Sequence, residues 1–219
     1  MGRAGGATGP RTDPDRTILA IAARQHGVVS RSQLLRGGVP PHAIDYRLGM
    51  GRLRRLHRGV YGTGPVTPRY QREAAALFAC GDEAVLSYHT ASALWGLTPA
   101  PPRNAPVDVT STRHVRGPRQ GVRFHRVCRL DRDEIDHRHG LPVTTPARTL
   151  LDIGCCIDSV ELERALARAE RSRVVMRDDV EAVLARYPRR RGAMALRVVL
   201  RAPGGPTLTA LRRKPVSSG

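Results

Sequence analysis

The sequence predicts an α+β fold in which three short helices and a tight β-hairpin precede a mixed α+β region that ends in helices. Helix-start signals occur three times within the first fifty residues. Apolar and charged residues alternate between Leu53 and Gly62, and a turn signal lies near Arg58-Gly59. This pattern predicts the hairpin. From Thr67 onward, apolar runs of strand length alternate with helical periodicity as far as Leu200.

Each of the first three helices has its own start signal. Asp13-Pro14 places a capping residue before a proline at the first helical position. Ser30 followed by Gln33 has the spacing of a capping box. Pro40-Pro41 can start a helix but not continue one, and it opens the stretch HAIDYRLGM, from His42 to Met50. Three short helices followed by a tight hairpin are the element order of a winged helix-turn-helix.

The second region mixes helical and extended patterns without an internal repeat. Proline-rich residues 98–106 interrupt it after the first helical patterns. We expect helices over about 69–80, 89–97, 146–155, 159–171, 177–185 and 190–200, and strands over 84–88, 107–111, 121–127 and 141–145.

These patterns divide the chain into four parts. Residues 1–12 are glycine-rich and are expected to be disordered. Residues 13–64 form the predicted winged helix-turn-helix, and residues 67–201 form the α+β domain. Residues 202–219 have no periodicity and end in small and basic residues, so we expect disorder there as well.

The charge balance favours a polyanion as partner. The 219 residues hold 37 Lys and Arg against 19 Asp and Glu, a formal net charge of +18. All but one of the basic residues are arginines, a bias that GC-rich coding alone can produce. GC-rich codons also supply Asp and Glu, so coding bias does not explain the acidic deficit. No apolar run approaches the roughly 20 residues of a membrane span, and we expect no membrane partner.

The cysteines give no metal or disulfide framework. Cys80, Cys128, Cys155 and Cys156 include no CxxC pair and no histidine at ligand spacing, so neither a zinc site nor another cofactor is expected. Adjacent Cys155 and Cys156 are interpreted as small core residues. Without a disulfide pattern or an apolar signal-peptide region, the sequence favours a cytoplasmic protein.

Two blocks of sequence carry a family resemblance. The first, QHGVVSRSQLLRGGVPPHAIDYRLGMGRLRRLHRGVY (25–61), resembles the winged-helix domain of AbiEi-type antitoxins. The second comprises AVLSYHTASALWGL (84–97) and LPVTTPARTLLDIG (141–154), which are similar to the middle region of the same proteins. The resemblance implies a helix-turn-helix that binds promoter DNA, often that of its own operon. It also implies a second domain that neutralises a nucleotidyltransferase-type toxin in a type IV toxin–antitoxin pair.

The chain departs from one arrangement of the family. Many longer relatives continue, after a segment similar to GGPTLT (204–209), into a domain similar to the very-short-patch-repair endonuclease. Here ALRRKPVSSG follows instead. The alternative function is therefore a truncated remnant of a protein that carried this endonuclease-like domain.

Candidate DNA contacts follow from the needs of a helix in the major groove, which are a polar outer face and cations beside it for phosphates. The residues matched to base-edge or sugar contact are His42, Asp45, Tyr46 and Arg47. The residues expected to contact phosphate or the adjacent minor groove are Arg52, Arg54, Arg55, His57 and Arg58. A merely solvated charged face is the alternative, and we favour DNA because the basic cluster falls on the predicted hairpin.

Asp45 is the exception on this face. Its carboxylate repels phosphate unless it accepts a hydrogen bond from a cytosine amino group or pairs with Arg47 or Arg52.

The sequence gives little support to catalysis or to RNA binding. Restriction-like nucleases need paired carboxylates and usually a lysine, but Asp108 and Asp152 have no partner at convincing spacing and the only lysine is Lys214. Asp152 is better explained by an ion pair with Arg148 at i, i+4. An RNA- or ribosome-binding protein fits the charge, but two Phe and one Trp supply few stacking platforms. We therefore predict a non-enzymatic regulator whose partners are double-stranded DNA and a toxin.

Overall fold

The computed structural model describes residues 13–202 except 115, 116 and 118. The predictions of disorder for residues 1–12 and for the tail beyond residue 202 lie outside the described residues. The chain divides into two compact units, one within residues 1–91 and 101–145 and the other within residues 92–100 and 146–219.

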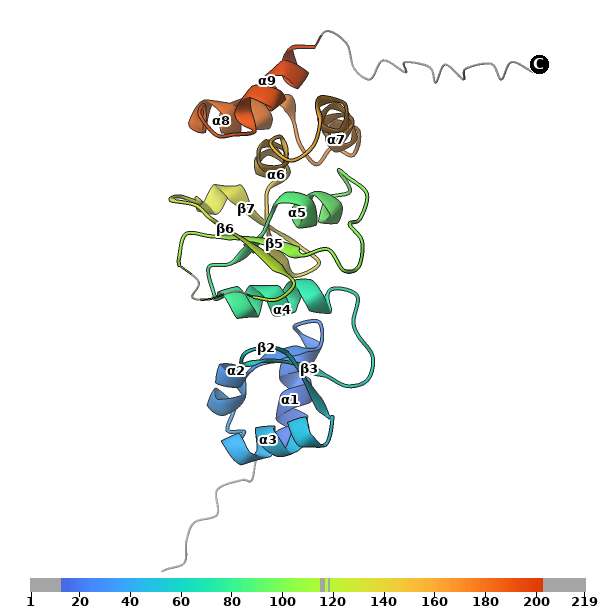
Figure 1. Cartoon of the computed structure of the whole chain (residues 1–219), viewed down its shortest axis with the longest axis vertical. Helices are drawn as coiled ribbons and strands as arrows, with labels where there is room; N and C mark the ends of the chain where they lie inside the picture. The colour runs from blue at the N-terminus through green and yellow to red at the C-terminus, as the bar shows by residue number, and fades with distance from the viewer. Residues whose placement is uncertain (1–12, 115–116, 118, 203–219) are drawn as a thin grey trace, which may run out of the picture. The chain divides into compact units, whose positions relative to one another are not determined.

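The three predicted helices of the first unit are present (Figure 1). They are α1 (Pro14–Ala23), α2 (Arg31–Arg36) and α3 (Pro41–Gly49). The capping signals work as expected, because the Asp13 side chain accepts a hydrogen bond from the Asp15 amide. Ser30 and Gln33 exchange side-chain and backbone hydrogen bonds in a complete capping box. Local sequence therefore fixes where these short helices begin.

A small antiparallel sheet completes the winged-helix part. It consists of β1 (Val28–Ser30), β2 (Leu53–His57) and β3 (Val60–Thr63) in the order β1-β3-β2. The hairpin β2–β3 was predicted, but β1 was not, because three residues between a turn and a helix cap carry no periodicity of their own. The core between the helices and the sheet contains Ile18, Ala22, Val29, Leu34, Val39, Ala43, Ile44, Leu53 and Tyr61.

Helix α4 (Gln71–Cys80) contacts the strands of this small sheet. The Gln71 side chain is buried, and its Nε2 donates to the Gly27 carbonyl at 3.4 Å. Gly27 has a φ of +71°, and a Cβ there would lie 3.0 Å from the Pro68 ring and 3.2 Å from the Gln71 amide. A glycine is therefore needed where the α1–β1 turn meets the start of α4.

The second sheet of this unit is mixed. Its strands are β4 (Val85–Leu86), β5 (Val107–Ser111), β6 (Val122–Arg126), β7 (Ile135–Arg138) and β8 (Leu141–Thr144), in the order β6-β5-β4-β8-β7. The pairs β5–β6 and β4–β8 are parallel, whereas β4–β5 and β7–β8 are antiparallel. A short 3₁₀ helix, Arg132–Glu134, precedes β7.

The β7–β8 hairpin contains the polar HRHG stretch, residues 137–140. His137 and Arg138 belong to β7, and only His139 and Gly140 form the turn. Both turn residues have positive φ, 53° and 75°, which matches the right-handed twist of a two-residue hairpin. Polar, charged strand residues hid β7 from an analysis based on apolar alternation.

The second unit is helical (Figure 1). Helix α5 (Tyr88–Leu94) crosses from the first unit into the second, and α6 (Pro146–Ile153), α7 (Ser159–Arg171), α8 (Arg177–Arg186) and α9 (Ala193–Arg201) follow. The predicted Arg148–Asp152 ion pair is confirmed at 3.1 Å, with both side chains fully buried. Arg190 adds a second guanidinium at 2.8 Å from the same carboxylate.

A close backbone approach fixes the start of α9. A Cβ on Gly192 would lie 1.9 Å from the carbonyl oxygen of Leu151, the neighbouring backbone on α6. We predict that Gly192→Ala lowers the free energy of unfolding by about 3 kcal/mol or more, because backbone atoms cannot move aside as a flexible side chain can. Urea denaturation followed by circular dichroism measures this difference.

Gly49→Ala is the matched control. Apart from its chain neighbours and the backbone of its own helix, no atom of the chain lies within 4 Å of a Cβ built at Gly49, the last residue of α3. Its stability should stay unchanged or rise by up to about 1 kcal/mol, the helix-propensity difference between glycine and alanine. Equal stability of Gly192→Ala and the unsubstituted chain would contradict the close approach.

Candidate nucleic-acid interface

The outer face of α3 presents three of the predicted residues to solvent. His42, Asp45 and Tyr46 are exposed, and the Tyr46 residue keeps 60% of its surface accessible. Ala43 and Ile44 point into the core. Because an α-helix has 3.6 residues per turn, a helix that buries Ala43 and Ile44 places His42, Asp45 and Tyr46 together on its exposed side. The arrangement is a short amphipathic helix with a polar face of hydrogen-bonding side chains.

Arg31, at the start of α2, connects this face to the hairpin. Its Nη1 donates to Asp45 Oδ1 at 3.4 Å and to Tyr61 Oη at 3.5 Å, and its amide donates to the Gly59 carbonyl at 2.8 Å. The hydrogen bond with Tyr61 and the charge of Asp45 raise the pKa of Arg31. Asp45 therefore pairs with Arg31, and not with Arg47 or Arg52 as the sequence suggested. Helical periodicity could not find Arg31, because its partners lie 14 and 30 residues away.

The hairpin continues the same row of polar groups. Arg55 lies directly opposite Tyr61 in the β2–β3 ladder, so their side chains share one face of the sheet. Arg55 and Arg58 are exposed, and Arg58 precedes the turn glycine, Gly59. The row Asp45, Arg31, Tyr61, Arg55 thus joins the outer face of α3 to a cationic hairpin.

Arg47 has a different place from the one the sequence predicted. Its side chain is 11% exposed, and its Nε donates to Asp15 Oδ1 at 2.6 Å. Its Nη1 also donates to the Ala43 carbonyl at 2.9 Å. The hydrogen bond with Arg47 lowers the pKa of the Asp15 carboxyl. Arg47 is therefore the cation that joins α3 to α1, and we leave it out of the proposed interface.

Arg54 and His57 also differ from the expectation. Arg54 Nη2 donates to Gln71 Oε1 at 2.9 Å and to Thr67 Oγ1 at 3.3 Å, so Arg54 contacts the start of α4. Arg54 and Arg55 are neighbours in a strand, and their side chains point to opposite faces. Burial, together with nearby Arg119, lowers the pKa of His57, so its imidazole is neutral at pH 7.

Arg52 remains a cation at the solvent surface. Its side chain is 62% exposed, and its Nη1 lies 3.4 Å from Asp15 Oδ2. Such an exposed pair is weak and can exchange for a phosphate. Arg52, Arg54, Arg55 and Arg58 are thus all exposed, and of these Arg54 binds Gln71 and Thr67 while Arg52 pairs weakly with Asp15.

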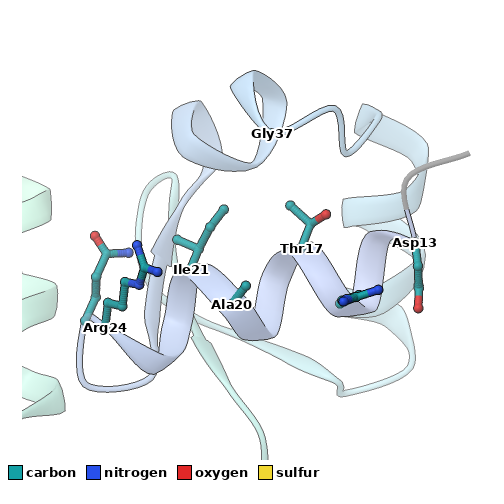
Figure 2. Close-up of a pocket in the computed structure, with 8 residues that line it drawn as sticks. Asp13, Thr17, Ala20, Ile21, Arg24 and Gly37 are labelled. Carbon is teal, nitrogen blue, oxygen red and sulfur yellow. The ribbon is translucent and has the colours of Figure 1, made fainter. Parts of the chain in front are cut away.

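A hollow lies beside α1, outside the α3–hairpin face (Figure 2). Its lining comes from α1, the residues flanking it and the end of α2: Asp13, Arg16, Thr17, Ala20, Ile21, Arg24, Gln25 and Gly37. In Figure 2, Asp13 and Arg24 lie near opposite ends of α1. None of the residues that the sequence assigned to DNA contact, all of which the structure describes, lines this hollow.

The isolated carboxylates have internal partners. Asp108 Oδ1 lies 2.8 Å from His125 Nε2, and Arg123 approaches the same oxygen at 3.5 Å. The His125 ring stacks on Tyr88 with centroids 3.8 Å apart, and Tyr88 has a φ of 46°. Sequence analysis missed this cluster, because strand register brings its members together. Among the described residues, no three His, Cys, Asp or Glu side chains form a group that could hold a metal ion.

The comparisons with known proteins agree with this architecture. Residues 16–63 match the family described as "Transcriptional regulator, AbiEi antitoxin", and residues 83–201, over half of the chain, match the "AbiEi antitoxin C-terminal domain". The chain belongs to the AbiEi antitoxin family. The resemblance found in the sequence is confirmed, and the matched N-terminal block of this AbiEi chain begins within α1 and ends with β3.

One solved structure supports the fold. The AbiEi chain is similar to the crystal structure of the RV2827C protein from Mycobacterium tuberculosis, with a TM-score of 0.56 and 16% sequence identity. The similarity covers 85% of this chain and 77% of that one. No curated protein matches the chain. No helix in the described part is long and apolar enough to cross a membrane.

The Arg47–Asp15 pair gives a pH-dependent prediction. Asp15→Asn should lower the free energy of unfolding at neutral pH by about 1 kcal/mol, because a nearly enclosed guanidinium loses its carboxylate. The Asp15 pKa is lowered by folding, so the stabilisation is present above the ordinary carboxyl pKa of about 3.9 and is lost as pH falls through the lowered value. The free energies of unfolding of Asp15→Asn and of the unsubstituted chain, measured by urea denaturation, should therefore become equal at acid pH.

Asp82→Asn provides the control, because Asp82 is exposed in a turn. The free energy of unfolding of this variant should equal that of the unsubstituted chain at each pH. A constant difference between Asp15→Asn and the unsubstituted chain from neutral to acid pH would contradict the ion-pair explanation.

Proposed function

We propose that this chain is an antitoxin that binds double-stranded DNA around its own promoter through the outer face of α3 and the β2–β3 hairpin, and thereby represses transcription. The observation that carries the proposal is the row from Asp45 through Arg31 and Tyr61 to Arg55, which places a polar helix face beside a cationic hairpin. A solvated charged surface needs no such alignment, whereas a winged helix on DNA does.

In this proposal α3 reads bases in the major groove. Tyr46 and His42 lie one turn apart on the exposed face and reach base edges or sugars. Asp45 is held by Arg31, which lowers the repulsion between its carboxylate and the phosphates. A carboxylate so placed accepts a hydrogen bond from the N4 amino group of cytosine, so we assign Asp45 to a C·G pair.

The hairpin and the residue directly before it supply the phosphate contacts in this proposal. Arg55 and Arg58 are exposed on the hairpin, and Arg52 precedes it. Each contact releases counterions from DNA, so binding should weaken as salt increases. Arg54 and Arg47 contribute indirectly by holding the hairpin and α3 to the helices behind them.

The proposal assigns residues 13–64 to DNA binding and residues 67–201 to the antitoxin function, acting without catalysis on a nucleotidyltransferase-type toxin. The match of the second segment to an AbiEi antitoxin domain supports this assignment. Co-expression with a candidate nucleotidyltransferase-type toxin tests it, because this chain should restore the growth that its partner toxin inhibits. Failure to restore growth would contradict the proposed antitoxin function but would not affect the proposed DNA binding.

The salt dependence of DNA binding tests the phosphate contacts. Arg55→Gln combined with Arg58→Gln should reduce the slope of log affinity against log salt by about 1.8, since each lost phosphate contact removes about 0.9. Fluorescence anisotropy with the upstream duplex and with a scrambled duplex measures the slopes. Equal affinity of the unsubstituted chain for both duplexes would contradict a sequence-specific regulator.

The control removes the same charge elsewhere. Arg164→Gln combined with Arg171→Gln changes two exposed arginines on α7. It should leave the slope nearly unchanged if the hairpin makes the phosphate contacts. An equal loss of slope in both double variants would show that net charge alone drives binding.

Substitution of the α3 face should change sequence preference. Asp45→Asn replaces an acceptor for cytosine with a side chain suited to adenine, so preference at one position should move from C·G toward A·T by about 1–3 kcal/mol. Tyr46→Ala should weaken the cognate duplex more than the scrambled one. Selection from a randomised duplex library measures both effects. With Asp45→Asn, an unchanged preferred sequence would exclude Asp45 from base readout.

A further inference from the structure

A pair of adjacent thiols lies in the turn between α6 and α7. Cys155 Sγ and Cys156 Sγ are 3.5 Å apart, and both residues are exposed. This corrects our expectation that the two cysteines are small core residues. Helix α6 ends at Ile153, and the turn that follows directs both side chains outward. The surface therefore presents two sulfur atoms side by side.

The turn that carries these thiols is firmly held. Both thiols point toward one backbone carbonyl, that of Asp152, at 3.2 Å from Cys155 Sγ and 3.8 Å from Cys156 Sγ. The Asp152 carboxylate is itself bound by two buried or half-buried arginines. On the other side, Gly154 packs against the backbone of Gly192. The backbone that carries the two sulfurs is thus held on both sides.

The geometry favours the dithiol over a disulfide. Consecutive Cα atoms across a trans peptide are about 3.8 Å apart, whereas disulfide-bonded residues usually have Cα atoms about 4.4–6.8 Å apart. A disulfide between Cys155 and Cys156 would be strained and easily reduced. The two thiols, side by side at the surface, can therefore bind a single soft ion together.

The sulfur separation and the ligand count select the class of ion. With ion–sulfur bonds of about 2.3 Å and an angle of about 100–110° at a pyramidal or tetrahedral centre, two thiolates lie about 3.5–3.8 Å apart, and the observed 3.5 Å falls at the lower end of this range. Structural zinc needs four protein ligands. Within the described ranges, no third metal-binding side chain joins these two. The site therefore suits an ion that needs only two protein sulfurs because it already carries another substituent.

We propose that Cys155 and Cys156 form a dithiol site for trivalent arsenic compounds. With a monosubstituted arsenoxide, two arsenic–sulfur bonds form, the arsenic–oxygen bond breaks, and both thiol protons leave with the oxygen as water. Arsenic remains trivalent and no electron is transferred. This site is independent of the proposed DNA interface, which lies on α3 and the hairpin.

Titration with phenylarsine oxide tests the site on the full, reduced chain. One equivalent should remove two thiols from reaction with 5,5′-dithiobis(2-nitrobenzoate). Cys155→Ser and Cys156→Ser should each release the arsenical to excess glutathione about 100-fold faster than the unsubstituted chain, because a chelate loses its second attachment. Proteolysis and mass spectrometry should find the arsenical on the single peptide that holds both cysteines.

Cys128→Ser is the control, because Cys128 is the other exposed cysteine. It should retain the arsenical as the unsubstituted chain does. Equal release from the unsubstituted chain and the Cys155→Ser variant, or an adduct that requires Cys128, would overturn the proposal. The peptide map of the unsubstituted chain decides the matter even if a serine variant fails to fold.

Discussion

A helix can read DNA only if its orientation relative to the neighbouring cations is fixed. In this chain the buried Ala43 and Ile44 and the Arg47–Asp15 pair hold α3, and Arg31 links that helix to the hairpin. Its amide binds the carbonyl of the hairpin turn, and its guanidinium bridges Asp45 on α3 and Tyr61 on β3. One residue therefore joins α2, the outer face of α3 and the hairpin. It also balances the carboxylate that would otherwise oppose binding to a polyanion. The proposed interface depends on this bridge more than on the total charge of the chain.

The net charge of +18 overstates the cationic surface available to a partner. Arg47 is nearly enclosed against Asp15, Arg54 binds the start of α4, and Arg148 is fully buried with Asp152. Their guanidinium groups hold elements together, because a planar group with several donors can satisfy carboxylates and carbonyls at once. The arginines that remain exposed near α3 and the hairpin are fewer, and of these Arg31 and Arg55 are connected through Tyr61. Placement thus matters more than number for this function.

Much of the fold and part of the candidate site could be predicted from local signals. The starts of α1 and α2 follow from Asp13-Pro14 and the Ser30 capping box, which act within a few residues. Strands β1 and β7 were missed because one is too short and the other too polar to show alternation. On α3, helical periodicity correctly placed Tyr46 on the exposed face. It failed for Arg47, whose long side chain is drawn inward by a carboxylate 32 residues away.

By itself, the sequence determined the helix starts, the hairpin, the family and the polar face of α3, because these depend on spacings of a few residues. Tertiary structure decided which charges face solvent and which are paired inside. Arg31 gained its partners, Arg54 turned toward Gln71, and Cys155 and Cys156 came to the surface through the packing of distant segments. The physical reason is that an ion pair or a packed turn requires two segments to meet. The sequence separation of the two segments does not predict where they come into contact.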